Sequence, residues 1–569
     1  MRQMARGERA TVVGIAVLSL IVRALAYFRY RFDSDEPQHL HVAWGWTAGL
    51  LQYRDLFDNH APLFHMLTAP ILRLVGERAD VLLYMRAPIV LLFAVVLACT
   101  YILGGRLYSN TVGIWAVILL SLFPVFFLKS LEYRTDNLWV ALWCVSLVVL
   151  TGGQLTNGRM FIFGLLLGAA AATSMKTSLL IITLAMSALV AWLFGHEERN
   201  LRIVVPAVLG ILIVPAIVAG YFAARGAWRN LLYSVIEFNA QIASSTPARD
   251  LWIKRATFVP VVLLILWIAW RKRPPAQHDP IVGWRFFFAF ATAFFSVALL
   301  SFWILISPRD YLVVLPLLAI FFAAAIDRLD IRLPLYIATS FIFVGAIWYY
   351  THGFEDGTTE HITMMGQVLG LTRPGEPLLD LKGETIYRQR PYYYIFEFIT
   401  RRLMYRGVIT DTIPEDVVRT QCHVAQADGV FFAPRGRAFL RENFLDVGRL
   451  RAAGQWIQDD GSFTIAVPGS YVILISAGEA TGALDGSPYR GQRMLATGRH
   501  TFVTSGVKEL LACLWAPAFI RGYSPFHLRD REFPGSPVFD SAHSDPGAPS
   551  GRRRHRRWGP DAARPGKGR

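Results

Sequence analysis

The chain alternates long apolar runs with short polar connections over its first 350 residues. Each run is close to the length of about 20 residues that an α-helix needs to cross a bilayer. The pattern therefore predicts eleven membrane-spanning helices. They cover residues 11–28, 87–104, 112–128, 137–151, 160–174, 177–194, 203–222, 257–270, 286–306, 311–326 and 334–350.

After residue 350 the pattern changes to that of a water-soluble domain. LTRPGEPLLDLKGE favours a strand between turns, PYYYIFEFITRRLMYRG an amphipathic helix, and VVRTQCHVAQADGVFFAP a helix followed by a strand. From about Trp456, Asp-Gly and Pro-Gly turns separate short alternating runs that are typical of β-structure. We therefore predict an α-helical polytopic membrane protein with a soluble C-terminal domain. Residues 1–350 form the membrane domain, and residues 351–520 form an outer domain that is α/β to about 450 and β-sandwich-like beyond it. Residues 521–569 are a basic tail whose Pro, Gly, Ser and Arg content predicts disorder.

Composition agrees with a membrane protein, since 54% of the 569 residues are hydrophobic and 17% are charged. The arginines before the first apolar run are typical of a secretory signal. No small-residue cleavage site follows, however, and further spans continue for three hundred residues, so we interpret that run as a span. Of the net charge of +16, residues 551–569 supply +7, from eight Lys/Arg against one Asp. The rest is spread over loops, and we predict no nucleic-acid partner.

The four cysteines show no spacing that suggests a metal site. Cys99 and Cys144 lie in apolar runs, where we interpret them as core residues. Cys422 and Cys513 lie in the outer domain, where a disulfide between them is the less favoured of two alternatives.

The lengths of the loops suggest an orientation. With a cytoplasmic N-terminus, the short basic loops at Arg106, Arg159 and DRLDIR fall inside. All the long connections then fall on the outer side, including the first outer loop over about 29–86 and everything after Tyr350. We expect a protein of the cell's inner or plasma membrane with its C-terminal domain outside.

The first candidate site is FDSDEPQHLHVAWGW, which follows the first span. Ser34 can cap a helix whose first turn holds Asp35 and Glu36, with Pro37 tolerated there. One face of that helix then carries His39 and Trp46. The local pattern fits an interfacial helix anchored by its tryptophans as well as it fits a functional site.

Further candidates lie near the ends of later spans. Asp136 precedes the fourth span and falls on the same side as Asp35, although the local sequence favours a simple helix cap with Glu132 and Arg134 solvated beside it. Lys176 lies between two closely spaced spans, where an ionisable side chain is expensive. Arg309 lies at the outer end of a span. Both cations suit either a snorkelling anchor or a bound phosphate.

No nucleotide-binding or hydrolase motif appears, since GxxxxGK[ST], GxGxxG after a strand, HExxH and GxSxG are all absent. The first loop instead resembles that of the GT-C glycosyltransferases, in the branch of the protein O-mannosyltransferases and the lipid A aminoarabinose transferase. The resemblance covers roughly residues 1–350. The matching positions are Asp35-Glu36, Gly49, Tyr53-Arg54-Asp55, Pro62-Leu63, Asp136, Lys176, Pro308-Arg309 and Pro316.

The resemblance implies an inverting transfer of a sugar from a polyprenyl-phosphate donor to an acceptor on the outer face of the membrane. In that reaction Asp35 takes the proton of the acceptor hydroxyl. Lys176 and Arg309 hold the departing phosphate. The other matched or neighbouring residues orient substrates: Glu36 and Asp136 as further catalytic carboxylates, and His39, Tyr53 and Asp55 as substrate-binding side chains.

The identity of the acceptor stays open between an envelope lipid, a glycan and a protein. The chain lacks the β-trefoil insert of the protein O-mannosyltransferases, which weakens the case for a protein. Members of the class differ in their use of metal, so a divalent cation also stays open, and no other cofactor is implied. The alternative function is a transporter or flippase of lipid-linked sugars. It is disfavoured because such proteins bind near the membrane midplane, often between related halves, and the chain has no internal repeat.

Overall fold

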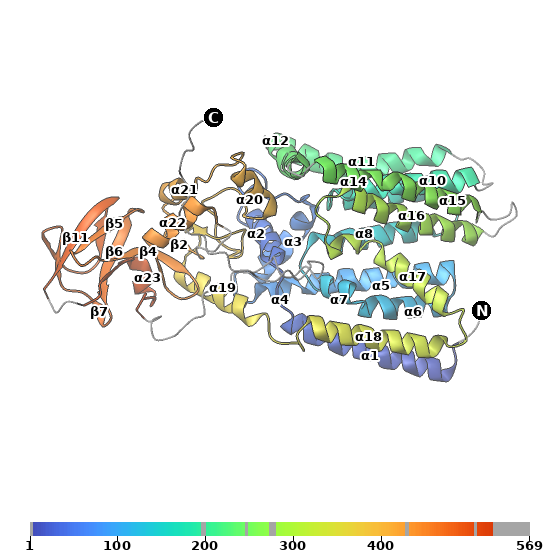
Figure 1. Ribbon diagram of the computed structural model, residues 1–569, viewed down its shortest axis with the longest axis horizontal. Coiled ribbons are helices and arrows are strands. Elements are labelled where there is room, and N and C mark those ends of the chain that lie inside the picture. Colours follow the sequence, from blue (N-terminus) through green and yellow to red (C-terminus); the bar gives the residue numbers. More distant parts are fainter. Residues whose placement is uncertain are drawn as a thin grey trace, which may run out of the picture.

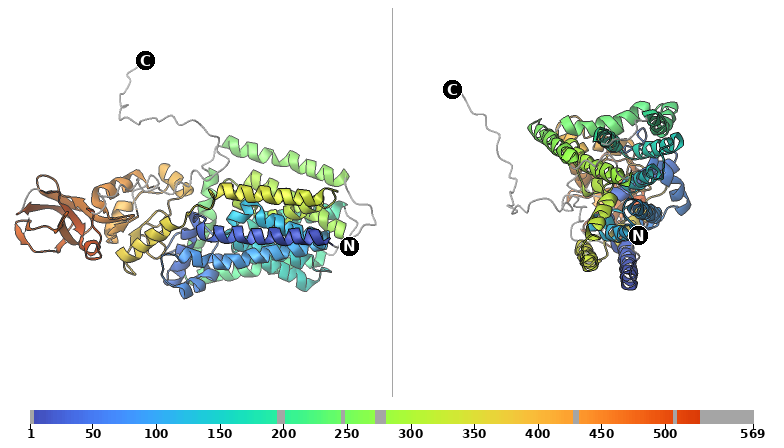
Figure 2. Two further views of the ribbon diagram at one scale, coloured as in Figure 1. Left: turned by 90° about the horizontal axis from the view of Figure 1, so that it is seen from below. Right: turned by 90° about the vertical axis from the view of Figure 1, so that its right-hand side faces the viewer.

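The structure is a computed structural model that describes residues 4–194, 201–244, 248–271, 280–426, 432–505 and 509–526. Long helices run side by side at one end of the molecule, and β-sheets lie at the other end (Figure 1). Short helices of the first loop and of the segment after residue 350 lie between these two parts. The views in Figure 2 show the same division, with the long helices parallel to the long axis.

Each of the eleven predicted spans contains a helix. They are α1 (Arg6–Arg29), α5 (Ala87–Leu107), α6 (Asn110–Leu122), α8 (Thr135–Leu150), α9 (Asn157–Ala171), α10 (Thr177–Phe194), α11 (Val204–Ala224), α15 (Phe258–Arg271), α16 (Pro280–Phe302), α17 (Leu315–Ile326) and α18 (Arg332–Tyr350). Within the described residues, five helices are long and apolar enough to cross a membrane: Arg6–Arg29, Val81–Leu107, Val204–Ala224, Ile281–Phe302 and Arg332–Tyr350. The protein is therefore a multi-pass membrane protein, while the exact number of eleven spans stays a prediction.

Shorter helices connect the long ones. Those between α6 and α18 are α7 (Pro124–Lys129), α12 (Trp228–Leu232), α13 (Phe238–Ser244), α14 (Ala248–Ala256), the 3₁₀ segments Leu201–Ile203 and Pro308–Tyr311, and the π-helical Tyr233–Glu237. The first loop folds into α2 (Asp35–Thr47), α3 (Leu63–Val75) and α4 (Val81–Met85). Helix α2 confirms the helix expected after the first span.

Helices α9 and α11 approach each other closely at glycines. A Cβ placed on Gly164 would lie 2.0 Å from the carbonyl oxygen of Ala207, and one on Gly210 would lie 2.3 Å from that of Phe161. Helix backbones approach this closely only where side chains are missing, which is a common device in membrane helix packing.

The region after α18 combines helices and strands. Its helices are α19 (Thr359–Leu371), α20 (Phe398–Tyr405), α21 (Ile413–Arg419), α22 (Pro434–Asn443) and α23 (Ala516–Ile520). Its strands are β1 (Leu378–Leu379), β2 (Val424–Ala425), β3 (Phe444–Asp446), β4 (Arg451–Trp456), β5 (Ser462–Ile465), β6 (Gly469–Ile475), β7 (Gly478–Glu479), β8 (Gly482–Leu484), β9 (Ser487–Tyr489), β10 (Arg493–Leu495), β11 (Gly498–Thr504) and β12 (Ala512–Trp515). The predicted helix and strands of this region lie where the sequence pattern placed them.

Two sheets organise these strands. The larger has the order β1-β2-β4-β12-β6-β10, with β3 paired to β4 and β7 to β6, and the smaller has the order β5-β11-β8-β9. Strands β1 and β2 pair in parallel, while β12 runs antiparallel to both of its neighbours. The C-terminal region is thus a sheet domain, as expected.

The disulfide considered for Cys422 and Cys513 is wrong, because both are free buried thiols. Cys513 lies on β12, opposite Gln455 of β4, and Cys422 precedes β2, which pairs with the other edge of β4. Neighbouring strands lie about 4.8 Å apart, so a residue beside β2 and one on β12 are separated by two such spacings. That separation exceeds the reach of a disulfide.

One apolar core joins the first loop to the sheet domain. It includes Phe32, Leu40 and Phe64 of the first loop together with Met365 and Ile386 of the C-terminal region, all nearly inaccessible to solvent. Burial of large apolar side chains on both sides fixes the C-terminal region against α2 and α3. Arg521 also bonds Glu376, with Nη1–Oε2 and Nη2–Oε1 distances of 2.9 and 3.0 Å. The remainder of the predicted basic tail, from residue 527, lies outside the described residues.

Candidate active site

The first turn of α2 is built by Asp33 and Glu36, which bond each other reciprocally. The Asp33 N–H donates to Glu36 Oε1 at 2.9 Å, and the Glu36 N–H donates to the Asp33 carbonyl at 2.9 Å. The Asp33 side chain also accepts from the Asp35 N–H at 3.2 Å. The prediction that Ser34 caps this helix is wrong, because its hydroxyl makes no cap bond and accepts instead from Lys382 Nζ at 3.0 Å. Asp33, one residue before Ser34, supplies the side-chain oxygen that accepts from the Asp35 N–H in the first turn.

Glu36 is fully buried and held on both oxygens. Arg86 donates to it through Nη2 at 2.6 Å and Nε at 3.0 Å, and the Tyr133 N–H donates at 2.8 Å. Both side chains of the Glu36–Arg86 pair are 0% exposed. These contacts tie α2 to the start of α5 and to the loop before α8. They favour a positioning role for Glu36, whose predicted part in catalysis stays untested.

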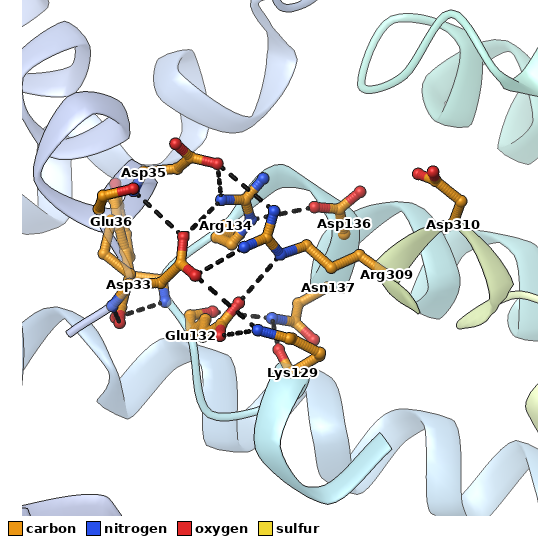
Figure 3. Close-up of polar contacts among 12 residues, drawn as sticks. Asp33, Asp35, Glu36, Lys129, Glu132, Arg134, Asp136, Asn137, Arg309 and Asp310 are labelled. Atoms are coloured by element: carbon orange, nitrogen blue, oxygen red, sulfur yellow. Dashed lines mark hydrogen bonds and ion pairs between the residues drawn. The ribbon is translucent and has the colours of Figure 1, made fainter. Parts of the chain in front are cut away.

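Two arginines lie at the centre of a cluster of carboxylates (Figure 3). Arg134 Nη1 contacts Asp33 at 3.0 Å and Asp35, while its Nε contacts Asp136 at 3.2 Å. The local alternative of a solvated Arg134 and Glu132 is therefore wrong, since these side chains are 7% and 0% exposed. Short-range sequence could not reveal this, because Arg134 pairs with Asp35 of α2 and Glu132 with Arg309, both far away in the sequence.

Arg309, in the turn between α16 and α17, completes the same cluster. It contacts Asp33 through Nη2 at 2.6 Å, Asp35 through Nη1 at 3.5 Å and Glu132 through Nε at 3.4 Å. Lys129 adds a contact with Glu132 at 2.7 Å. We call the set of Asp33, Asp35, Lys129, Glu132, Arg134, Asp136 and Arg309 the charge cluster. It brings together Asp35, Asp136 and Arg309 from positions up to 274 residues apart, as the sequence analysis expected.

Asp35 is the carboxylate of this cluster with the greatest exposure, at 24%. Burial alone would raise its pKa, but the charges of Arg134, Lys382 and Arg309 outweigh that effect and hold the pKa well below its usual range. Asp35 is thus ionised at neutral pH and surrounded by cations. Displacement of any one cation by a substrate anion would make the carboxylate more basic.

Lys176 lies beside the cluster and ion-pairs with Asp310, the residue after Arg309. Asp310 is 1% exposed and also accepts from the Ser307 N–H at 2.8 Å, which fixes the turn that carries Arg309. Lys176 Nζ lies 5.8 Å from the ring centre of Trp303 and 6.0 Å from that of Trp139. One short segment, Pro308–Tyr311, therefore carries Arg309 and also holds Lys176 through Asp310.

His39 lies one helical turn after Asp35, in a second polar group that we call the histidine group: His39, Asp58, His60 and His65. A hydrogen bond of 3.1 Å joins His39 Nδ1 and His65 Nε2, and His60 Nδ1 donates to Asp58 at 2.9 Å. His39 Nε2 is buried without a hydrogen-bond partner. Burial and the charge of His60 lower the pKa of His39 well below its usual value, so the ring is neutral.

Tyr53 and Asp55 make local contacts in the turn that follows α2. Tyr53 adopts φ +73° and its hydroxyl donates to the His60 carbonyl at 2.6 Å. Asp55 accepts from the Leu51 N–H and from Arg54, both at 2.8 Å. Asp55 also lines a pocket with Tyr392 and Tyr393. Both residues therefore shape the first loop, and their predicted contact with substrate stays untested.

Within the described ranges, no group of three or more His, Cys, Asp or Glu side chains could hold a metal ion. The carboxylates of the charge cluster have arginine and lysine partners instead. A divalent cation stays an open prediction.

The sequence analysis missed several residues of the site. Asp33 lies two residues before Asp35 and was detectable as a third acid in FDSDE. Arg86 and Lys382 were not, because each acts across a long sequence separation, 50 residues to Glu36 and 347 residues to Asp35.

The chain is a multi-pass membrane protein whose fold is similar to that of solved ArnT structures. The particular solved structure that carries this likeness is ArnT from Cupriavidus metallidurans in the apo state, with a TM-score of 0.51 and 14% identity over 78% of this chain and 98% of that chain. ArnT from the same organism bound to undecaprenyl phosphate gives a TM-score of 0.49 with the same identity and coverage. The family model for dolichyl-phosphate-mannose-protein mannosyltransferases matches residues 59–223. No curated protein matches the chain. The fold predicted from the sequence is thereby confirmed.

Proposed function

We propose that the protein is an inverting glycosyltransferase that moves a sugar from a polyprenyl-phosphate donor to a hydroxyl acceptor on the outer face of a plasma or inner membrane. The observation that carries the proposal is the contact of Asp35 with Arg309 inside the charge cluster. A proton acceptor and a phosphate-binding cation then lie within one site, as phosphate-leaving transfer to a hydroxyl requires.

The donor phosphate is bound by Arg309 and Lys176. Arg309 has a planar fork suited to phosphate oxygens, and Lys176 ion-pairs with the next residue, Asp310. When the phosphate takes over Arg309, Asp35 loses one of its cations and its pKa rises towards its usual value. Substrate binding therefore activates the base that the free enzyme holds inactive.

The reaction is a single displacement. Asp35 takes the proton from the acceptor hydroxyl, whose oxygen forms a bond to the anomeric carbon. The bond from that carbon to the phosphate oxygen breaks, and the polyprenyl phosphate leaves with the electron pair. Arg309 and Lys176 stabilise the charge that develops on the phosphate. Asp136 keeps Arg134 directed at Asp35, and Glu36 fixes the turn that carries it.

The acceptor would be an envelope lipid or glycan. The fold and the family match support a membrane transferase, and the matching family is that of dolichyl-phosphate-mannose-protein mannosyltransferases. The contacts of this chain do not select among sugars. The chain lacks the β-trefoil insert of the protein O-mannosyltransferases, which favours a lipid or glycan acceptor over a protein.

The test uses the purified protein in lipid nanodiscs, a panel of labelled polyprenyl-phosphate sugars and an extract of envelope lipids and glycans. Wild type should release polyprenyl phosphate and label an acceptor. Asp35→Asn should lower the rate by about 10²- to 10⁴-fold, since general-base catalysis is worth that much. Glu415→Gln, on the exposed surface of α21, is the matched acid-to-amide control and should be unaffected. Full activity in Asp35→Asn contradicts the assignment of the base, and movement of intact lipid-linked sugar across vesicles would favour the flippase.

A further inference from the structure

A side chain of the C-terminal region reaches into the charge cluster. Lys382 Nζ donates to Asp35 Oδ1, and it also donates to Ser34 Oγ at 3.0 Å. Its side chain is 13% exposed. The two arginines contact the other oxygen, Oδ2, of the same carboxylate. Lys382 and the arginines therefore hold opposite ends of one carboxylate.

The segment that carries Lys382 is rigidly built. Asp380 accepts from the Gly383 N–H at 2.9 Å, from the Thr385 N–H at 2.9 Å and from Arg390 Nε at 2.8 Å. Asp380 and Arg390 are 0% and 5% exposed. These contacts close the 380–390 segment into a fixed loop, because a buried carboxylate with three donors resists rearrangement.

The same loop is fitted to α2. His41 Nδ1 donates to the Ile386 carbonyl at 2.7 Å. Gly383 adopts φ +103°, and a Cβ there would lie 2.7 Å from the Cβ of His41. Glycine is thus required by both the backbone conformation and the close approach. The close fit between the 380–390 loop and α2 indicates a permanent contact and not a mobile lid.

Lys382 also balances the charge of the cluster. The cluster contains four carboxylates, Asp33, Asp35, Glu132 and Asp136, and the membrane domain supplies three cations to them, Lys129, Arg134 and Arg309. Lys382 is the fourth cation. Without it one buried carboxylate would lack a counter-charge, which is strongly unfavourable in a site of low exposure.

We propose that Lys382 is a positioning residue of the active centre, through which the C-terminal domain fixes the orientation and charge of Asp35. The inference rests on the proposed function. When a donor phosphate draws Arg309 away from Oδ2, Lys382 still holds Oδ1, so Oδ2 turns to the acceptor hydroxyl. The C-terminal domain is in this way part of the catalytic unit and not only an appendage.

The test compares Lys382→Met, Lys382→Arg and the control Arg435→Gln, which removes a cation from an exposed pair of the same domain. Lys382→Met should lower kcat by about tenfold or more, since a misoriented base loses transition-state interactions. The loss should be larger at pH 5.5 than at pH 8, because removal of this cation raises the pKa of Asp35, so that more of the base is protonated at the lower pH. Lys382→Arg should restore the pH dependence, and Arg435→Gln should match wild type at both values.

A double-mutant cycle separates this inference from the proposed function. The thermal midpoints of Asp35→Asn, Lys382→Met and the double variant are measured in detergent, with no substrate. The double variant should lose less stability than the sum of the single variants. Additive losses of stability, or an unchanged kcat in Lys382→Met, would overturn the inference. A gain in activity in Lys382→Met would also overturn it, because it would indicate that Lys382 inhibits the enzyme. A wild type that transfers no sugar contradicts the proposed function, while the cycle still decides whether Lys382 and Asp35 are coupled.

Discussion

Arg86 and Glu36 form an ion pair that is wholly enclosed by the protein, with two bonds of 2.6 and 3.0 Å and no exposure of either side chain. Arg86 also donates to the carbonyls of Tyr30 and Arg31, each at 3.0 Å. One guanidinium thus joins the end of α1, the start of α2 and the start of α5.

Arg86→Met should reduce the free energy of unfolding by about 3–5 kcal/mol, because it leaves a buried carboxylate without its partner. Thermal or denaturant unfolding of the purified protein measures this loss. The matched control is Arg78→Met in the same loop, whose pair with Asp80 is about one-third exposed and should be worth at most about 1 kcal/mol. Equal losses in the two variants would show that burial of the Arg86 pair carries no special weight.

Arg309→Gln should lower the rate of sugar transfer by about 10²- to 10³-fold, since the developing charge on the phosphate loses its main donor. Arg309→Lys should recover part of the rate, because a point charge replaces a planar fork. Arg328→Gln is the control, since Arg328 is exposed at the other end of α17. Single-turnover release of labelled polyprenyl phosphate is the measurement. Wild-type rates in Arg309→Gln would remove Arg309 from the phosphate site.

Glu397 should make stability depend on pH. Burial raises its pKa to about 7, while an unfolded chain titrates near the usual 4.5, so between these values the folded protein binds more protons than the unfolded one. Stability from this group is complete below about pH 4.5 and is lost as pH rises to 7.

Glu397→Gln keeps the oxygen that accepts from Asn59 Nδ2 at 2.8 Å and removes the titration. The difference in thermal midpoint, variant minus wild type, should therefore increase from pH 5 to pH 7.5. Burial also raises the pKa of Glu384 to about 7. Because Glu384 titrates in both proteins, its contribution cancels in the difference of thermal midpoints. A difference that stays flat over this range would contradict a raised pKa at Glu397.

Gly210→Leu should prevent normal packing of α9 against α11. A Cβ at Gly210 would lie 2.3 Å from the Phe161 carbonyl oxygen, and that backbone has no room to move away. Gly220→Leu, on the same helix, is the control because nothing lies within 4 Å of its Cβ position. The yield of monodisperse protein in detergent should fall for Gly210→Leu alone.

The periodicity of the sequence predicted the helices well because a membrane span is a local property of about 20 residues. The convergence of Asp35, Asp136 and Arg309 was also predictable, since the order of spans places all three at the same membrane face. The burial of Arg134 was not predictable, because nothing nearby in the sequence distinguishes a solvated arginine from one buried by partners on another helix. Lys382 was out of reach for the same reason, as it depends on how the 380–390 loop docks on α2.

The charge cluster is closed upon itself, since each of its cations already has a carboxylate partner. A small anion from solution must break such a pair before it binds, and at ordinary concentrations it gains too little to do so. An anion tethered in the membrane beside the site has a far higher effective concentration, which offsets the free energy needed to break the ion pair. For the phosphate donor proposed above, this internal charge neutralisation would therefore favour lipid-anchored phosphates over the free phosphate and nucleotides of the surroundings.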